Sequence, residues 1–331
     1  MNNKFLAVIG LAIFLIILSN VEILKVVSII YKANLEIIVI ALIVFSIMLL
    51  LKGIKWKYIL ATQEVEIGTL KATKYFTIGF FFSSFTPGRI GDFVRAIYIA
   101  KKKTLTIGLV SVFLDRLIDI GLLLIFALAG LLIIAKEKAE LNLIDLIFIV
   151  GIITALFFLL IILLLKDNYM KALLRPFYLM FLPDNAKNFV SEKFNEFLLT
   201  IKKISTKKLE FIVAIFCGII FWLLTIFFAQ LLAQSINIKI SYQEMLVLYS
   251  IIALADVVPI TISGIGTREG ITILFFSYLN FEAESAIAFS LLLFSISYLT
   301  TAFIGYLSLV TEPIDFNEWK KKLSTKAKKQ K

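Results

Sequence analysis

The chain has 331 residues, of which 60% are hydrophobic and 17% are charged, and its mean hydropathy is +0.98. A soluble domain of this size could not hide so much apolar surface, whereas a bilayer is an apolar solvent for one side of every helix. The composition therefore predicts a polytopic membrane protein of the all-α class, and it argues against a soluble enzyme or binding domain.

Net charge and residue usage narrow the function classes further. The formal net charge of +11 would suit a nucleic-acid partner, but the positive residues are concentrated in a few polar loops and in the C-terminal tail. This distribution is typical of cytoplasmic loops in membrane proteins, so we expect no nucleic-acid partner. Histidine is absent, and the single cysteine, Cys217, lies in an apolar run. We therefore expect no disulfide, no metal site and no cofactor.

Apolar stretches long enough to cross roughly 30 Å of hydrocarbon as single helices recur along the chain. The first begins close to Met1, and because no A-x-A-like cleavage site follows it, we interpret it as an uncleaved span and not as a signal peptide. The six stretches are Phe5–Leu24, Leu35–Ile54, Ile107–Ile134, Leu143–Leu165, Leu209–Ala233 and Ala283–Val310.

Two further apolar stretches are interrupted. Leu70–Phe85 resumes over Ile90–Ile99, and Tyr242–Val258 resumes over Thr267–Leu279. At about 1.5 Å of rise per residue, the resumed parts would be about 15 and 20 Å long, which is too short to cross the bilayer. We therefore favour two re-entrant helical hairpins. Two hairpins that each cross the membrane twice would have the same parity, because they also begin and end on one side of the membrane.

The charges of the predicted connections orient the chain. The connections at 135–142, 234–241 and 280–282 are short and not basic, whereas 166–208 and the C-terminal tail carry many lysines. By the positive-inside rule, we expect a protein of the cell membrane with both termini in the cytoplasm. Each interrupted stretch then begins and ends on the same side of the membrane. The other lysines assigned to cytoplasmic loops are Lys52, Lys55, Lys57, Lys71, Lys74, Lys101, Lys102 and Lys103.

The domain organisation that follows has one folded unit. We expect a single transmembrane domain over 1–311, with a first half at 1–134 and a second half at 143–311. Within the second half, 166–208 has apolar residues at helical spacing with lysines between them, which favours an amphipathic helix on the cytoplasmic face. Residues 312–331 are expected to be a Lys-rich cytoplasmic tail.

The two interruptions have similar sequences. Each contains two glycines, one arginine and an acid shortly after the arginine, and the predicted orientation gives them opposite directions in the membrane. Inverted repeats with discontinuous helices recur in secondary transporters. Glycine lets the backbone turn, which frees N–H groups that attract an anion together with the helix dipole. The alternative is a chance resemblance between two interfacial turns. The predicted break residues are Pro87, Gly88, Gly91, Pro259, Gly264 and Gly266.

Arginine is used selectively in this chain. Of five arginines, four fall in or beside the predicted breaks and spans, while lysine supplies nearly every surface charge. Guanidinium stays charged when desolvated and binds phosphate oxygens bidentately, whereas ammonium is a strongly hydrated point charge. These four arginines therefore predict a phosphate-bearing ligand, and they are Arg89, Arg95, Arg116 and Arg268.

Acidic residues also lie inside the predicted spans. Asp115 and Asp119 share one helix face because they are four residues apart, and Asp256 lies in the second broken helix. An ionised group there costs about 3 kcal/mol unless it is paired. Arg116 lies about 100° round the helix from Asp115, so we expect it to pair with another element. The alternative to a ligand path is an ion-pair network that only fixes helix packing.

These residues resemble the flippase-like family, which is the transmembrane region of lysylphosphatidylglycerol synthases. The same region is found as standalone proteins and as the membrane half of some archaeal dolichol-phosphate glycosyltransferases. The resemblance covers nearly the whole chain and rests on Phe85-Thr86-Pro87-Gly88-Arg89-Ile90-Gly91-Asp92, on Asp115-Arg116 with Asp119, and on Pro259 through Ser263-Gly264-Ile265-Gly266 to Arg268-Glu269.

The resemblance implies lipid translocation along a charged path. Aspartate stands at 92 and 115, where glutamate is commoner in the family, so the reach of these acids differs. The chain leaves no room for a soluble transferase domain, and we do not expect the transferase activities. The residues implied to line the headgroup path are Arg89, Asp92, Asp115, Arg116, Arg268 and Glu269.

The favoured function is a flippase or scramblase, and not an enzyme, whose partner is an anionic phospholipid or a polyprenyl-phosphate-linked lipid. A second candidate is a membrane-embedded polyprenyl-diphosphate phosphatase, for which the first break offers only Ser83, Ser84 and Thr86 as hydroxyl groups. The sequence also leaves open a transporter of a small soluble anion and a structural or regulatory membrane protein. The residues expected to bind substrate are Arg89, Arg95, Arg116, Arg268, Asp92, Asp115, Asp119, Asp256 and Glu269.

Overall fold

The computed structural model describes residues 17, 19, 21–86, 88–137, 141–165, 207–258, 261 and 264–314. In these ranges the regular structure is helical and contains no β-strand, which confirms the predicted all-α class. Several predictions lie largely or wholly outside the described residues: the first span at 5–24, the amphipathic segment at 166–208, the tail at 312–331, and the break residues Pro87 and Pro259.

Long apolar helices form the body of the molecule. Their sequences are rich in Leu, Ile, Val and Phe and lack proline, so interior backbone groups are bonded within the helix, as a spanning segment requires. In the part of the chain that the structure describes, five helical segments are long and apolar enough to cross a membrane, and they match five predicted spans. They are α3 (Leu35–Ala61), α6 (Leu105–Glu137), α7 (Leu141–Leu165), α10 (Lys208–Ser235) and the continuous run of α13 (Ala283–Leu293), η3 (Phe294–Leu299) and α14 (Thr300–Thr311).

Helix α3 corrects one prediction about the basic connections. It continues to Ala61, well past the end of the span predicted at Ile54. The five lysines expected in this cytoplasmic loop therefore lie in helices: Lys52, Lys55 and Lys57 in α3, and Lys71 and Lys74 in α4 (Thr69–Ser83). The side chains of Lys52 and Lys55 are buried. The apolar run ends at Ile54, but lysines can be buried in a helix when carboxylates on a neighbouring helix neutralise them.

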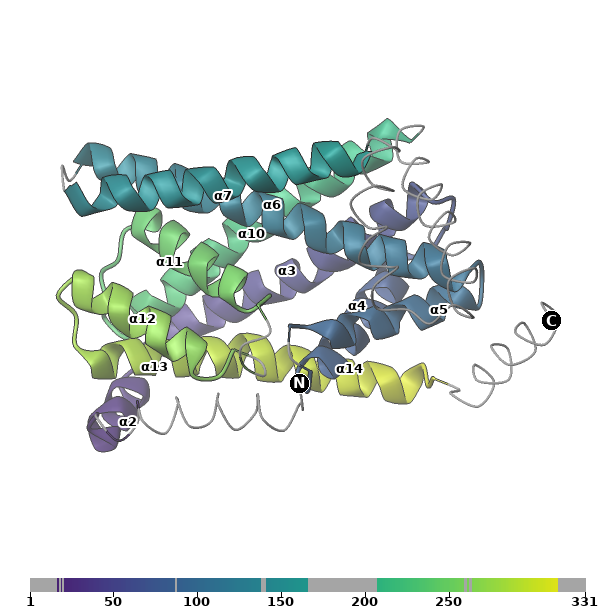
Figure 1. Cartoon of the computed structure of the whole chain (residues 1–331). Coiled ribbons are helices and arrows are strands. Elements are labelled where there is room, and N and C mark those ends of the chain that lie inside the picture. The colour runs from purple at the N-terminus through teal and green to yellow at the C-terminus, as the bar shows by residue number, and fades with distance from the viewer. Residues whose placement is uncertain are drawn as a thin grey trace, which may run out of the picture.

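Each interrupted stretch folds into a helical hairpin that turns at its break. In the first hairpin, α4 (Thr69–Ser83) is followed by the 3₁₀ helix η1 (Ile90–Arg95) and by α5 (Ala96–Ala100), and η1 packs back on α4. In the second, α11 (Tyr242–Ala255) is followed by α12 (Thr267–Tyr278), and these two helices contact each other. Figure 1 shows α4 and α5 toward one end of the long helices, and α11 and α12 toward the other.

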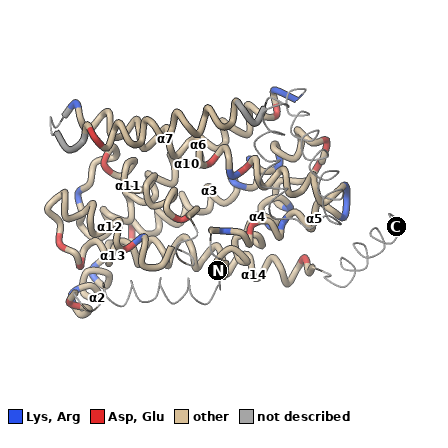
Figure 2. The backbone as a smooth tube through the Cα atoms, viewed as in Figure 1, with Lys and Arg blue, Asp and Glu red and all other residues tan. Residues whose placement is uncertain are grey.

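The connections between helices gather at two opposite ends of the bundle (Figure 1). The α3–α4 and α5–α6 connections and the end of α14 lie at one end, and Figure 2 shows basic positions beside α5 there. The α10–α11 and α12–α13 connections lie at the other end. The short helix α2 (Ile23–Tyr31) is also at this second end, where Lys25 Nζ lies 2.8 Å from Glu282 Oε2.

Contacts between the helices follow a regular pairing. Helix α3 packs along α10, α4 packs on α14, and α11 packs on α6. Helix α5 packs on α6, and α12 packs on α13. The main hydrophobic core includes Phe45 of α3, Phe228 of α10, Met245 of α11 and Phe289 of α13. This packing holds both hairpins against the long helices.

Candidate functional site

Both breaks contain backbone in the left-handed conformation. Gly88 and Arg89 of the first break have φ of 59° and 55°, and Gly264 and Gly266 of the second have φ of 71° and 86°. Glycine adopts this conformation at little steric cost, but other residues adopt it rarely. Arg89 is therefore held in place by its surroundings and not by its own backbone preference.

Local contacts fix the first break. The Gly91 amide donates a hydrogen bond to Thr86 Oγ1 at 2.8 Å, and Ser83 Oγ donates one to the Arg89 carbonyl oxygen at 3.2 Å. A Cβ at Gly91 would lie 2.2 Å from the carbonyl carbon of Phe82. Only glycine at this position lets η1 approach α4 so closely, and this approach positions the residues on either side of it.

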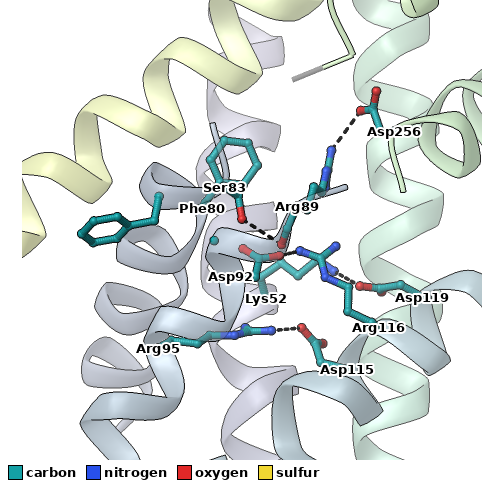
Figure 3. Close-up of polar contacts among 12 residues, drawn as sticks. Lys52, Phe80, Ser83, Arg89, Asp92, Arg95, Asp115, Arg116, Asp119 and Asp256 are labelled. Atoms are coloured by element: carbon teal, nitrogen blue, oxygen red, sulfur yellow. Dashed lines mark hydrogen bonds and ion pairs between the residues drawn. The ribbon is translucent and has the colours of Figure 1, made fainter. Parts of the chain in front are cut away.

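The two breaks meet at one ion pair (Figure 3). Arg89 Nη2 lies 3.0 Å from Asp256 Oδ2, which joins the first break to the C-terminal end of α11. The Tyr298 hydroxyl accepts a hydrogen bond from Arg89 and donates one to Asp256. Tyr298 lies in η3, a π-helical turn within the α13–α14 run, and such turns are frequent at functional sites. The Arg268 guanidinium carbon lies 4.5 Å from the centroid of the Tyr298 ring.

A second ion pair joins η1 to α6. Arg116 pairs with Asp92, whose side chain is fully buried (Figure 3). The prediction that Arg116 pairs with another element, and not with its neighbour Asp115, is thus confirmed. The pair ties the residues after the first break to the middle of a long helix.

A network of five charged side chains ties α3, η1 and α6 together. Lys55 Nζ lies 2.8 Å from Asp115 Oδ1 and 2.7 Å from Asp119 Oδ1, as expected for two acids on one helix face. Lys52 Nζ lies 2.6 Å from Asp119 Oδ2, and Arg95 Nη2 lies 2.6 Å from Asp115 Oδ2. None of these side chains is more than 7% exposed. We call this set the buried network.

Aromatic side chains complete the surroundings of the buried network. Trp222 of α10 donates a hydrogen bond from Nε1 to Asp119 Oδ1 at 2.8 Å. The Lys52 ammonium lies 4.2 Å from the Phe221 ring centroid, and the Arg95 guanidinium carbon lies 4.8 Å from that of Trp56. Ring faces attract cations, so these contacts offset part of the cost of burying the charges.

A small recess opens at the junction of the two breaks. It has room for about one water molecule. Among the described residues, no group of three or more acidic or cysteine side chains is arranged to hold a metal ion. The polar groups of the recess are a guanidinium, a carboxylate and several hydroxyl groups. The residues that line the recess are Phe80, Ser83, Ser84, Thr86, Gly88, Arg89, Asp256 and Tyr298.

Comparison with known proteins places this chain in a family. The family described as the lysylphosphatidylglycerol synthase TM region matches residues 5–305. The chain belongs to this family. Two relatives are UPF0104 membrane protein MJ1595 of Methanocaldococcus jannaschii and UPF0104 membrane protein PH1989 of Pyrococcus horikoshii. The first is 24% identical over 93% of this chain and 94% of its own length, and the second is 24% identical over 92% and 96%. The chain is thus a multi-pass membrane protein of the lysylphosphatidylglycerol synthase TM-region family.

In this lysylphosphatidylglycerol synthase TM-region protein, the residues predicted to bind substrate lie in separate groups. Glu269 does not line the recess. Its carboxylate accepts hydrogen bonds from the Gly266 amide at 2.7 Å and from Ser290 Oγ at 2.7 Å. It therefore holds the second break in shape. The other groups are Arg95, Asp115 and Asp119 in the buried network, Arg116 with Asp92, and Arg89, Asp256 and Arg268 around Tyr298.

Three side chains of the site were missed from the sequence. Lys52 and Lys55 are three residues apart and so share a helix face, which is the same kind of signal that paired Asp115 with Asp119. The end of the apolar run hid this signal, because the two lysines read as loop residues. Tyr298 carried no signal, since nothing in its sequence surroundings marks a π-helical turn.

Proposed function

We propose that this protein translocates an anionic phospholipid or a polyprenyl-phosphate-linked lipid across the cell membrane. The observation that carries the proposal is the meeting of two helix breaks, reached from opposite ends of the bundle, at the pair of Arg89 and Asp256. Irregular backbone at membrane depth is tolerated where it is buried in protein or lines a wet cavity. In secondary transporters, discontinuous helices of this kind bind the substrate between two inverted halves.

The proposed membrane arrangement has six spans, two re-entrant hairpins and both termini in the cytoplasm. If 1–134 and 143–311 form an inverted repeat, the packing of α4 on α14 corresponds to the packing of α11 on α6. The packing of α5 on α6 corresponds in the same way to the packing of α12 on α13. All four contacts are observed, which supports the repeat. The short second arms of both hairpins support re-entry. The basic positions beside α5 favour the cytoplasm for that end.

The exposed fractions of the arginines favour particular roles. The side chains of Arg89 and Arg116 are 22% and 18% exposed, whereas the members of the buried network are nearly sealed from solvent. Arg89 and Arg116 are therefore the arginines that a lipid phosphate can reach, and guanidinium binds phosphate bidentately. The buried network holds the helices that carry them. The family description names the synthase of a phospholipid, which favours a lipid over a small soluble anion.

Lipid movement in proteoliposomes tests this proposal. Headgroup-labelled lipids on the inner leaflet are expected to reach a membrane-impermeant quencher faster with the wild-type protein than in empty vesicles. Arg89→Ala and Arg116→Ala are each expected to lower the rate at least about tenfold, since a hydrogen bond to a charged group contributes about 1.5–3 kcal/mol. Lys102→Ala, an exposed position in the α5–α6 connection, is the control and should keep the wild-type rate.

The proposal fails if no phospholipid or polyprenyl phosphate moves faster than in empty vesicles under either a proton or a sodium gradient. It also fails if the two arginine variants move lipid as fast as Lys102→Ala. Release of phosphate from a polyprenyl diphosphate, measured in the same vesicles, would instead favour the phosphatase.

A further inference from the structure

The junction between the two breaks holds a carboxylate where the ligand's phosphate is expected. Arg89 Nη2 contacts Asp256 Oδ2 at 3.0 Å, and the Tyr298 hydroxyl contacts both partners. Carboxylate and phosphate both offer oxygens that accept charge-assisted hydrogen bonds from a guanidinium. Asp256 therefore satisfies Arg89 in the same way as a bound phosphate would.

The recess beside this pair is small. It holds about one water molecule, which is less than a phosphate group needs. The Arg89 side chain is 22% exposed and that of Asp256 is 5% exposed, so a ligand can reach the guanidinium before it reaches the carboxylate. A phosphate can take the place of Asp256 at Arg89 Nη2 only when Asp256 withdraws.

We propose that Asp256 is an internal competitor for the phosphate site, and that a phosphate headgroup displaces it from Arg89. The inference rests on the proposed function, because it takes Arg89 as a phosphate-binding residue. The pair of Arg89 and Asp256 joins the first hairpin to the second. Displacement of Asp256 therefore releases the second hairpin from the first, which couples binding to separation of the two breaks.

The surroundings of the recess suit a ligand that carries an apolar tail. Phe85 and Ile90, next to recess residues of the first break, are 65% and 61% exposed, and Val258 of the second break is 51% exposed. Apolar side chains beside a charged site favour an amphiphile, because both parts of it are then matched. A lipid phosphate is therefore expected to bind more tightly than inorganic phosphate does.

The test is the affinity of the purified full-length protein, in a non-ionic detergent, for dihexanoyl phosphatidate. Asp256→Asn keeps the shape of the side chain and removes its charge. We expect this variant to bind at least about tenfold more tightly than wild type, because a competitor that fills a site about 90% of the time weakens binding by that factor. Glu282→Gln is the matched control, since it removes one negative charge from a side chain that is 62% exposed, and its affinity should not change.

Unchanged or weaker binding by a folded Asp256→Asn protein overturns the inference. If this variant elutes as aggregate, Tyr298→Phe replaces it: loss of the hydroxyl that holds Asp256 is expected to tighten binding by a smaller factor, and unchanged or weaker binding again overturns the inference. Dihexanoylglycerol, which lacks the phosphate, should bind both proteins equally; tighter binding to Asp256→Asn would show that phosphate is not the exchanged group.

Two further arms separate the possible failures. Inorganic phosphate should show the same tightening at lower affinity, and equal affinity with phosphatidate would overturn the lipid as the source of the phosphate. Tighter binding by Asp256→Asn together with no lipid movement in proteoliposomes would reject the proposed function but keep the exchange. Lipid movement without the tightening would reject the exchange alone.

Discussion

Lysine and arginine have different surroundings inside this protein. Two arginines of the site, Arg89 and Arg116, each pair with one acid and keep part of their surface exposed. Lys52 and Lys55 instead sit among Asp115 and Asp119, where each ammonium is enclosed. An enclosed ion pair is costly to break, because the remaining partner is left charged and desolvated. The enclosed lysines are thus suited to stabilising the helix packing, whereas the two arginines keep surface that a ligand can reach.

The buried network predicts a large loss of stability on removal of Lys55. Lys55→Met keeps the length of the side chain but leaves two carboxylates with one cation fewer, at a cost of about 3–5 kcal/mol. We expect a clearly lower unfolding temperature in detergent, measured by intrinsic fluorescence. Lys57→Met is the matched control, since Lys57 lies on the same helix and forms no ion pair within the described ranges. Equal unfolding temperatures of the two variants would contradict the structural role of the network.

Pairings within the site could be predicted only where helix geometry determines them. The four-residue spacing of Asp115 and Asp119 placed both acids against one cation, and Lys55 contacts both. The angle between Arg116 and its neighbours excluded a local partner, but the partner itself, Asp92, came from tertiary packing. No spacing along the sequence relates a residue at 89 to one at 256, so the junction of the breaks could not be predicted.

The helical elements were predictable where the sequence is apolar and uninterrupted. Helices α6, α7 and α10 begin and end within a few residues of the predicted spans. The second arm of the first hairpin was less predictable. It was expected as one helix over Ile90–Ile99, and it divides into η1 and α5. Gly91 lies close to the α4 backbone in the part that is a 3₁₀ helix. This close approach depends on tertiary packing, which cannot be inferred from the sequence.

The close approach of η1 to α4 predicts that Gly91→Ala disturbs the first hairpin. The added Cβ would lie 2.2 and 2.3 Å from backbone atoms of Phe82 and Ser83, so η1 must move, at a cost of about 1–3 kcal/mol for overpacking. We expect a lower unfolding temperature and slower lipid movement. Gly270→Ala is the control, because a Cβ there meets nothing within 4 Å and alanine favours a helix by up to about 1 kcal/mol. Similar effects of both substitutions would contradict the packing argument.

At the scale of the whole molecule, the positions of the connections carry the functional argument. Alternating access to a central site needs the two halves to approach it from opposite sides. The first hairpin starts and ends at the end of the bundle that carries the α3–α4 and α5–α6 connections, and the second hairpin starts and ends at the other. The number of predicted membrane crossings and the positions of the lysines predicted that each hairpin begins and ends on one side. They gave no information on how the two breaks meet.

Cysteine labelling from the two sides of the membrane tests this arrangement, since the native Cys217 is buried and should react little. Lys239→Cys, in the exposed α10–α11 connection, is expected to react with a membrane-impermeant maleimide in intact cells. Glu66→Cys and Lys102→Cys, exposed on either side of the first hairpin, should react only after permeabilisation, because Lys101, Lys102 and Lys103 of the α5–α6 connection favour the cytoplasm for that end. Labelling of Glu66→Cys and Lys102→Cys from opposite sides would show that the segment between them crosses the membrane an odd number of times, which neither a re-entrant nor a full hairpin does. Labelling of both from outside would invert the proposed orientation and leave the hairpin intact.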